Sequence, residues 1–245
     1  GDRRRNGGRP EPLAIDLFSG LGGWTEGLLA EGYRVVGFDC ERHVYGEAQY
    51  QAQLVLQDVL TLHGAQFRDA TLIVASPPCQ AYSYRAMPWK RAKALPPPDN
   101  SLFEACFRIQ REACEAAGRY IPLVVENVCG AQKWVGRAAW HYGSFYLWGD
   151  IPALMPNAKL QMLSDATKVG GFSWSDFGKP DYKPLAFNGE AVRRLCEGVK
   201  PSISRQTSSK SSARKAASAH IAKIPFPLAR HIAAVWHPRN DARQV

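Results

Sequence analysis

An apolar run that ends in glycines lies near the start of the chain: Leu13-Ala14-Ile15-Asp16-Leu17-Phe18-Ser19-Gly20-Leu21-Gly22-Gly23. The run predicts a buried parallel strand, and the glycines predict a tight turn into a helix over residues 24–30. Such a turn lets a ligand approach the backbone, and the helix start offers free N–H groups. Asp39 ends a second predicted strand, where a carboxylate is suited to ribose hydroxyls. This favours a site for a nucleoside-containing cofactor; the alternative is a tight turn in a sheet protein.

The same alternation of strands and helices continues along the first half of the chain. Apolar runs predict strands over residues 33–38, 71–75, 120–125 and 144–148, and helical spacing predicts helices over 43–53, 102–117 and 228–236. Asn100 or Ser101 is the candidate N-cap of the helix over 102–117. The order favours an α/β fold with a doubly wound, mostly parallel sheet. Glycines, prolines and serines after Pro156 predict a small irregular C-terminal region.

Composition narrows the functional classes. The chain has 245 residues, of which 45% are hydrophobic and 22% charged, as in a globular protein. No apolar run approaches the roughly 18 residues of a membrane span. The six cysteines form no Cys-x-x-Cys pair, so we expect no metal site, free thiols and a cytoplasmic location. The net charge of +9 falls within residues 157–245, which hold 15 basic and 6 acidic residues. This excess suits either a phosphate-binding surface for nucleic acid or a solvated, flexible segment, and charge alone does not separate the two.

Two further motifs follow predicted strands. Pro77-Pro78-Cys79-Gln80 follows the strand over 71–75, and Glu126-Asn127-Val128 follows the strand over 120–125. Ligands of open α/β sheets bind at the carboxyl ends of the strands, so Cys79 is a candidate nucleophile facing the cleft. Burial can keep the Glu126 carboxyl protonated near neutral pH. Taken singly, each has a plainer reading: a core cysteine and a solvent-facing acid.

Together, and in this order and spacing, the three motifs resemble those of the DNA cytosine-5 methyltransferases. The resemblance covers residues 13–156 and resumes over 225–235. It implies a Rossmann-like, class I S-adenosylmethionine-dependent methyltransferase fold and the cofactor S-adenosylmethionine, with S-adenosylhomocysteine as the product and no metal. The cofactor-binding residues it implies are Asp16, Phe18, Ser19, Gly20, Leu21, Gly23, Asp39, Cys40, Asp58, Val59, Pro78 and Leu102.

The resemblance also implies how the residues act on the substrate. The target cytosine is flipped out of double-stranded DNA, and the Cys79 thiolate adds to ring C6. Glu126 holds the N3 edge and shares its proton, and Asn127 completes the motif. Segment 80–99 matches a loop that closes over the base. Its candidate DNA-binding residues, with the C-terminal ones, are Gln80, Ser83, Arg85, Lys90, Arg91, Lys93, Lys210, Arg214 and Lys215.

The sequence departs from the family at a Gln-x-Arg-x-Arg motif, whose arginine contacts the flipped cytosine. The best match, residues 142–149, has no arginine, and we expect Arg137 or His141 to supply the contact. The expected organisation is a flexible basic arm (1–10), a catalytic and cofactor-binding domain (11–156), a small target-recognition region (157–219) and a C-terminal helix returning to the catalytic domain (220–245). Such compactness resembles phage-borne or orphan enzymes.

Other functions remain open at the level of sequence. An RNA cytosine-5 methyltransferase would use the same cysteine and glutamate. A non-catalytic DNA-binding paralogue that assists a partner would fit the missing arginines but not the retained Cys79 and Glu126. A nicotinamide-dependent dehydrogenase leaves both of those motifs unexplained. We expect a monomer with no membrane association, with a partner chain as a possible aid to sequence recognition.

Overall fold

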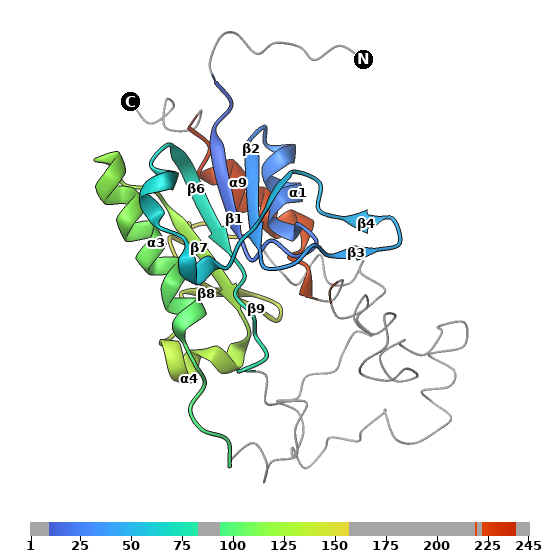
Figure 1. The fold of residues 1–245 in the computed structure, drawn as a ribbon, viewed down its shortest axis with the longest axis vertical. Coiled ribbons are helices and arrows are strands. Elements are labelled where there is room, and N and C mark those ends of the chain that lie inside the picture. The colour runs from blue at the N-terminus through green and yellow to red at the C-terminus, as the bar shows by residue number, and fades with distance from the viewer. Residues whose placement is uncertain (1–9, 83–93, 157–218, 220–221, 239–245) are drawn as a thin grey trace. The chain divides into compact units, whose positions relative to one another are not determined.

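The computed structural model describes residues 10–82, 94–156, 219 and 222–238 (Figure 1). Its central feature is a seven-stranded sheet with strand order β5-β2-β1-β6-β7-β9-β8. Its strands are β1 (Leu13–Leu17), β2 (Arg34–Asp39), β5 (Gln53–Leu56), β6 (Ala70–Ala75), β7 (Leu123–Asn127), β8 (Trp140–Tyr142) and β9 (Phe145–Gly149). Neighbouring pairs from β5 to β7 are parallel, whereas β9 is antiparallel to both β7 and β8. The predicted α/β fold with a doubly wound, mostly parallel sheet is confirmed.

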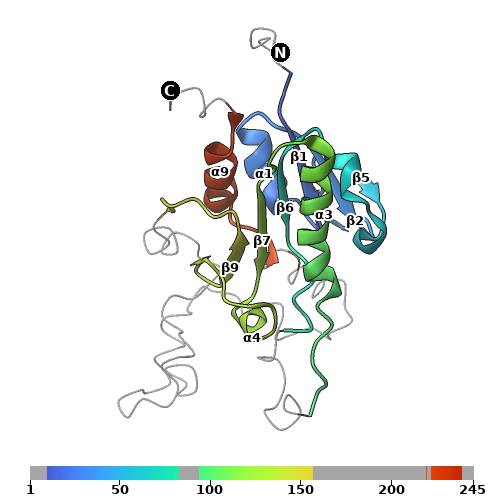
Figure 2. The same cartoon turned by 90° about the vertical axis from the view of Figure 1, so that its left-hand side faces the viewer.

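Helices cover both faces of this sheet, as Figure 2 shows. The helix α3 (Ser101–Ala117) packs on one face over the largest apolar cluster, which includes Ile73 and Val125. The helices α1 (Gly23–Ala30) and α9 (Phe226–Val235) lie together on the other face. Shorter helical segments are α4 (Gln132–Val135), η1 (Val59–Thr61), η2 (Gly64–Phe67) and η4 (Cys129–Ala131). No helix among the described residues is long and apolar enough to cross a membrane.

Two glycines bring α1 and α9 into close contact. A Cβ atom at Gly27 would lie 2.4 Å from the backbone carbon of Ala229, and one at Gly23 would lie 2.4 Å from the backbone nitrogen of Ile224. The Tyr33 hydroxyl, just after α1, donates a hydrogen bond of 3.0 Å to the carbonyl of Ala233 in α9. Residues 10–82, 94–156 and 222–238 therefore form one compact unit.

The helix predicted over residues 43–53 is wrong. The chain forms a short antiparallel hairpin there, β3 (Val44–Tyr45) and β4 (Ala48–Gln49), and then the sheet strand β5. Gly46 has a φ of +62° between the hairpin strands, a conformation that glycine adopts without strain and that ends a helix. The strands β5 and β8 were not predicted. Helix α3 begins at Ser101, whose N–H donates to the carboxylate of Asp99 at 2.8 Å.

Candidate active site

The predicted site residues gather at one edge of the sheet. Because β2, β1, β6 and β7 are neighbouring parallel strands, their carboxyl ends meet there, at the lower edge in Figure 1. Asp39 ends β2, the glycine turn follows β1, and Ser76 follows β6. Glu126 and Asn127 are the last residues of β7. Four segments separated by up to about a hundred residues of chain thus reach one edge because of the strand order alone.

Positive backbone angles shape the turn after β1. Phe18 has a φ of +59°, rare for a residue with a side chain, and Gly20 and Gly22 have φ values of +51° and +78°. The Gly20 N–H donates a hydrogen bond of 2.9 Å to an Asp39 carboxylate oxygen, which ties the turn to the end of β2. An added Cβ at Gly20 would meet only a carbonyl oxygen at 4.0 Å, so there is open space beside this backbone. Leu21 and Gly23 continue the turn and are buried.

The remaining predicted cofactor residues lie in other segments of the chain, and Asp39 is bonded directly to the glycine turn. Asp39 is 8% exposed, and its second oxygen accepts a 3.3 Å bond from the N–H of Glu41. The exposed Cys40 thiol donates to the same oxygen at 3.6 Å, and its pKa is raised by partial burial and by the Asp39 charge. Asp58 is exposed and caps η1 by accepting the Leu60 N–H at 2.9 Å.

Two of these side chains are anchored differently: Val59 lies in the apolar core, while Leu102 is half-buried at the start of α3. Because the Val59 side chain packs in the core, a ligand could contact this residue only through its backbone.

Two buried polar atoms at the glycine turn have no hydrogen-bond partner in the described part of the chain. They are the Ser19 Oγ and one carboxyl oxygen, Oδ1, of Asp16. The Asp16 side chain is 1% exposed, and burial raises its pKa to about 8 despite the hydrogen bond from Thr25. Buried polar groups without partners are unfavourable, and a polar ligand beside the turn relieves that cost. The donor and acceptor set therefore fits a cofactor that carries hydroxyl and charged groups.

The turn that carries Cys79 is fixed by the neighbouring strand. The Asn127 amide donates a buried hydrogen bond of 2.9 Å to the carbonyl of Pro77. The Tyr82 N–H donates to the carbonyl of Cys79 at 2.9 Å, and the Tyr82 hydroxyl donates to the Asn100 side chain at 2.9 Å. A Cβ at Gly130 would lie 2.4 Å from the carbonyl oxygen of Tyr82, so glycine is needed for the turn to pack here. Asn127 thus has an observed contact that orients the cysteine turn.

Glu126 is buried beside this turn. Burial raises the pKa of its carboxyl to about 8, while a hydrogen bond with Ser76 lowers it. Ser76 in turn accepts a 3.0 Å bond from the indole of Trp24 in α1. Burial also raises the pKa of the half-buried Cys79 thiol, and the Glu126 carboxylate raises it further. Protonation of Glu126 removes that second contribution, so the two groups influence each other's ionisation.

The residues predicted to contact nucleic acid are placed only in part. Gln80 is exposed beside Cys79, as is Pro78, which was predicted to contact the cofactor. Arg137 is exposed in the segment between α4 and β8, and His141 is exposed on β8, where its ring stacks on Tyr146 with centroids 4.9 Å apart. The other predicted contacts lie outside the described residues: Ser83, Arg85, Lys90, Arg91, Lys93, Lys210, Arg214 and Lys215.

Sequence reasoning missed three polar residues at this edge. Ser76 links Trp24 to Glu126, and Thr25 and Tyr50 form a hydrogen-bonded group with Asp16. Thr25 carried little signal, because the same helix also contains the polar residue Glu26. Tyr50 carried none, because its partner is 25 residues away in the chain.

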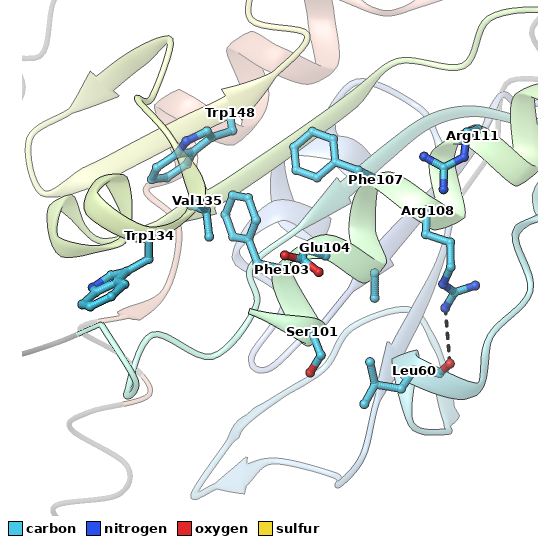
Figure 3. A pocket seen from close by; sticks show the side chains of 11 residues that line it. Leu60, Ser101, Phe103, Glu104, Phe107, Arg108, Arg111, Trp134, Val135 and Trp148 are labelled. Carbon is cyan, nitrogen blue, oxygen red and sulfur yellow. Dashed lines mark hydrogen bonds between the residues drawn. The ribbon is translucent and has the colours of Figure 1, made fainter. Parts of the chain in front are cut away.

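A pocket of about 730 Å³ lies along α3 (Figure 3), and its lining residues Leu60 and Ser101 are chain neighbours of the predicted cofactor residues Val59 and Leu102. Its lining includes Phe103, Phe107, Trp134 and Trp148, together with Arg108 and Arg111. None of the predicted catalytic or cofactor residues lines it. Among the described residues, no group of three His, Cys, Asp or Glu side chains is placed to hold a metal ion.

Comparison with known proteins agrees with this arrangement. Residues 13–132 match the family described as C-5 cytosine-specific DNA methylase. No curated protein matches the sequence significantly.

Several solved structures are similar to part of the chain. One is described as a DNA modification methyltransferase encoded within an E. coli prophage, with 22% identity, a TM-score of 0.34, and coverage of 51% of this chain and 35% of that one. The S. pombe Dnmt2 methyltransferase is 17% identical with a TM-score of 0.35, and the match covers 52% of this chain and 37% of that one. The Entamoeba histolytica methyltransferase EhMeth is 16% identical with a TM-score of 0.33, and the match covers 52% of this chain and 41% of that one. The matched part of this chain therefore spans well under half the length of these proteins.

Proposed function

We propose, from the premise that residues 13–132 belong to the C-5 cytosine-specific DNA methylase family, that this chain methylates C5 of cytosine in double-stranded DNA. One observation carries the proposal: Glu126, buried and with a pKa of about 8, lies beside the turn that carries the half-buried thiol of Cys79. A carboxyl that keeps its proton at neutral pH can donate to a ring nitrogen while a thiolate attacks the ring.

The chemistry divides between these two side chains. The Cys79 thiolate forms a bond to C6 of a cytosine flipped out of the duplex, and Glu126 gives its proton to N3, so the ring becomes an enamine with a nucleophilic C5. S-adenosylmethionine, when bound at the glycine turn, supplies the methyl group. Loss of the C5 proton to solvent, cleavage of the sulfur–C6 bond and return of the N3 proton to Glu126 then give back the thiolate and restore the aromatic ring. Asn127 keeps the Cys79 turn in place through Pro77.

The residues around the glycine turn would hold the cofactor. The Asp39 carboxylate is suited to the ribose hydroxyls, the exposed Asp58 to the adenine amino group, and Phe18 and Leu102 to the adenine ring. The open space beside Gly20 and the unpartnered Ser19 oxygen support this assignment. The remaining predicted contacts are Asp16, Leu21, Gly23, Cys40, Val59 and Pro78.

The basic C-terminal third supports DNA as the partner. Residues 157–245 contain 15 basic and 6 acidic side chains, a balance that favours phosphate contact. In this proposal the enzyme is a monomer of the cytoplasm, bacterial or phage-derived, and Arg137 or His141 contacts the flipped base. Neutralising Lys210, Arg214 and Lys215 together should flatten the salt dependence of DNA binding by up to about three units of slope.

Covalent trapping tests the proposal. Fluorine at C5 cannot leave as a proton, so an active enzyme stalls with its cysteine bound to 5-fluorocytosine. We would incubate the chain and S-adenosylmethionine with DNA duplexes or matched RNAs that contain 5-fluorocytosine in many sequence contexts, and look for an adduct that survives denaturant. The Cys79→Ala variant should form none, whereas Cys129→Ala, a half-buried thiol after β7, should form it normally. An adduct with RNA alone would overturn the DNA assignment, and its absence with both would favour the non-catalytic paralogue.

A further inference from the structure

A buried group of three polar side chains lies beneath the glycine turn and takes no part in the mechanism above. The Thr25 hydroxyl of α1 donates a 2.6 Å hydrogen bond to Oδ2 of Asp16. The Tyr50 hydroxyl, from the segment between β4 and β5, lies 2.7 Å from the same Thr25 oxygen. Thr25 has one proton and donates it to Oδ2 of Asp16, so Tyr50 is then the donor to Thr25. All three residues are buried, at 0%, 1% and 7% exposure for Thr25, Asp16 and Tyr50.

Two glycines make room for the tyrosine. Gly37 of β2 pairs with Asp16 in the sheet register, and a Cβ there would lie 2.3 Å from the Tyr50 hydroxyl oxygen. A Cβ at Gly22, in the turn itself, would lie 3.1 Å from the Tyr50 ring. The phenol is therefore enclosed between the turn and the neighbouring strand, and its hydroxyl has one position. Tyr50 directly follows the hairpin that the chain forms in place of the helix predicted over 43–53, so the hairpin positions this ring.

The hydroxyl pair fixes one oxygen of Asp16 and leaves the other without a partner. Oδ1 is buried and makes no hydrogen bond within the described residues. The titratable groups that act on this carboxyl are Asp39 from β2 and Tyr50, and neither supplies a positive charge. Because burial raises the pKa of Asp16 to about 8, its carboxyl keeps its proton near neutral pH, and a cation beside Oδ1 would favour the ionised form. In S-adenosylmethionine the cationic groups, the sulfonium and the ammonium, both belong to the amino-acid part.

We propose that Tyr50, acting through Thr25, is a positioning residue that presents the open oxygen of Asp16 to the cationic amino-acid part of S-adenosylmethionine. The inference rests on the proposed function, because it takes that cofactor as the ligand. The family resemblance already implies a cofactor contact for Asp16, and the inference adds the positioning role of Thr25 and Tyr50.

Calorimetric titration of the full chain with two ligands tests it. S-adenosylmethionine contains the amino-acid part, and 5′-methylthioadenosine lacks it. Tyr50→Phe keeps the ring and removes the hydroxyl, so it should weaken S-adenosylmethionine binding about three- to tenfold and leave 5′-methylthioadenosine within about twofold. Thr25→Val should act like Tyr50→Phe, with little further loss in the double variant, and Thr25→Ser should restore most of the affinity.

A matched control is available on the same hairpin. Tyr45→Phe also removes one hydroxyl, which contacts His43 at 3.5 Å and not Asp16, and should leave both affinities unchanged. Equal losses of affinity for both ligands in Tyr50→Phe, or no loss of affinity for S-adenosylmethionine, would overturn the role of the hydrogen-bonded relay from Tyr50 through Thr25 to Asp16. If the unmodified chain bound neither 5′-methylthioadenosine nor S-adenosylmethionine, the result would overturn both the proposed function and this inference. Circular dichroism melting of each variant separates these results from unfolding.

Discussion

Each half of the sheet's carboxyl edge contains one buried carboxyl group whose pKa is raised to about 8, and the two halves hold that group differently. On the β1–β2 side, Asp16 lies within the sheet and is fixed by two hydroxyls and a tied glycine turn. On the β6–β7 side, Glu126 ends its strand, interacts with Ser76 and lies beside a thiol. The first arrangement is rigid and suits a ligand that must be held. The second leaves a proton and a nucleophile close together, as bond-making chemistry requires.

The largest expected effect comes from the nucleophile. Cys79→Ser should lower the turnover number by about 10⁴-fold or more, because a hydroxyl of ordinary acidity does not add to the ring. Binding of S-adenosylmethionine should stay within about threefold, since the thiol is not in the β1–β2 half. Single-turnover methylation and calorimetry measure the two quantities. Near-normal turnover would contradict the assignment of chemistry to the β6–β7 half. The matched change in the β1–β2 half is Ser19→Ala, which should lower the affinity for the cofactor.

Glu126→Gln should come next. Losing the proton donor should lower the turnover number by about 10² to 10⁴-fold. It should also stabilise the fold at neutral pH, because the folded-state pKa of about 8 lies above the ordinary 4.5 and ionisation therefore favours unfolding. The wild type should lose stability from pH 5 to pH 8, on the order of 3 kcal/mol at pH 7, and the glutamine variant should not lose that part. Urea titrations of both proteins across this pH range measure the free energy of unfolding. If the stability of the wild type and of the variant changed in parallel with pH, Glu126 would already be ionised at pH 5.

Asp39→Asn sharpens the comparison from the binding side. The change weakens the hydrogen bond that the Gly20 N–H donates and removes the charge suited to ribose hydroxyls. Cofactor affinity should fall about tenfold, while the turnover number at saturating cofactor stays within about twofold. Steady-state kinetics with varied S-adenosylmethionine separates the two. A loss confined to the turnover number would place Asp39 in the chemistry instead.

The smallest expected effect concerns the support of the cysteine turn. Gly130→Ala places a methyl group 2.4 Å from the carbonyl oxygen of Tyr82, so the turn must shift. We expect a loss of about 1–2 kcal/mol of stability and a turnover number lowered a few-fold, with cofactor affinity unchanged. Gly32→Ala is the control for the methyl group, since its Cβ would meet nothing within 4 Å, although its φ of +85° carries its own strain. An unchanged turnover number would show that the turn tolerates displacement.

Sequence patterns predicted what depends on local apolar runs. The strands before the glycine turn, Ser76 and Glu126 were expected within a few residues, and their strand ends marked the site. The hairpin at Val44–Gln49 was missed because its apolar spacing is compatible with a helix, and the outcome depends on Gly46 and on Tyr50 fitting over Gly37. Neither β5 nor the relay from Tyr50 to Asp16 has a local signal, because both depend on partners elsewhere in the chain. The roles of Cys79, Glu126 and the cofactor residues came from the family resemblance.

The close contact between α1 and α9 has a consequence for synthesis. The first turn of α1 lies against Ile224, about two hundred residues later in the chain, and Gly27 lies against Ala229. At roughly 5–20 residues per second, a ribosome needs about 10 to 40 s to make the intervening polypeptide. During that time the helix that starts at the glycine turn has no cover on its outer face. A nascent chain therefore acquires its complete cofactor-binding half only after α9 has emerged, long after the cysteine and glutamate strands have been made.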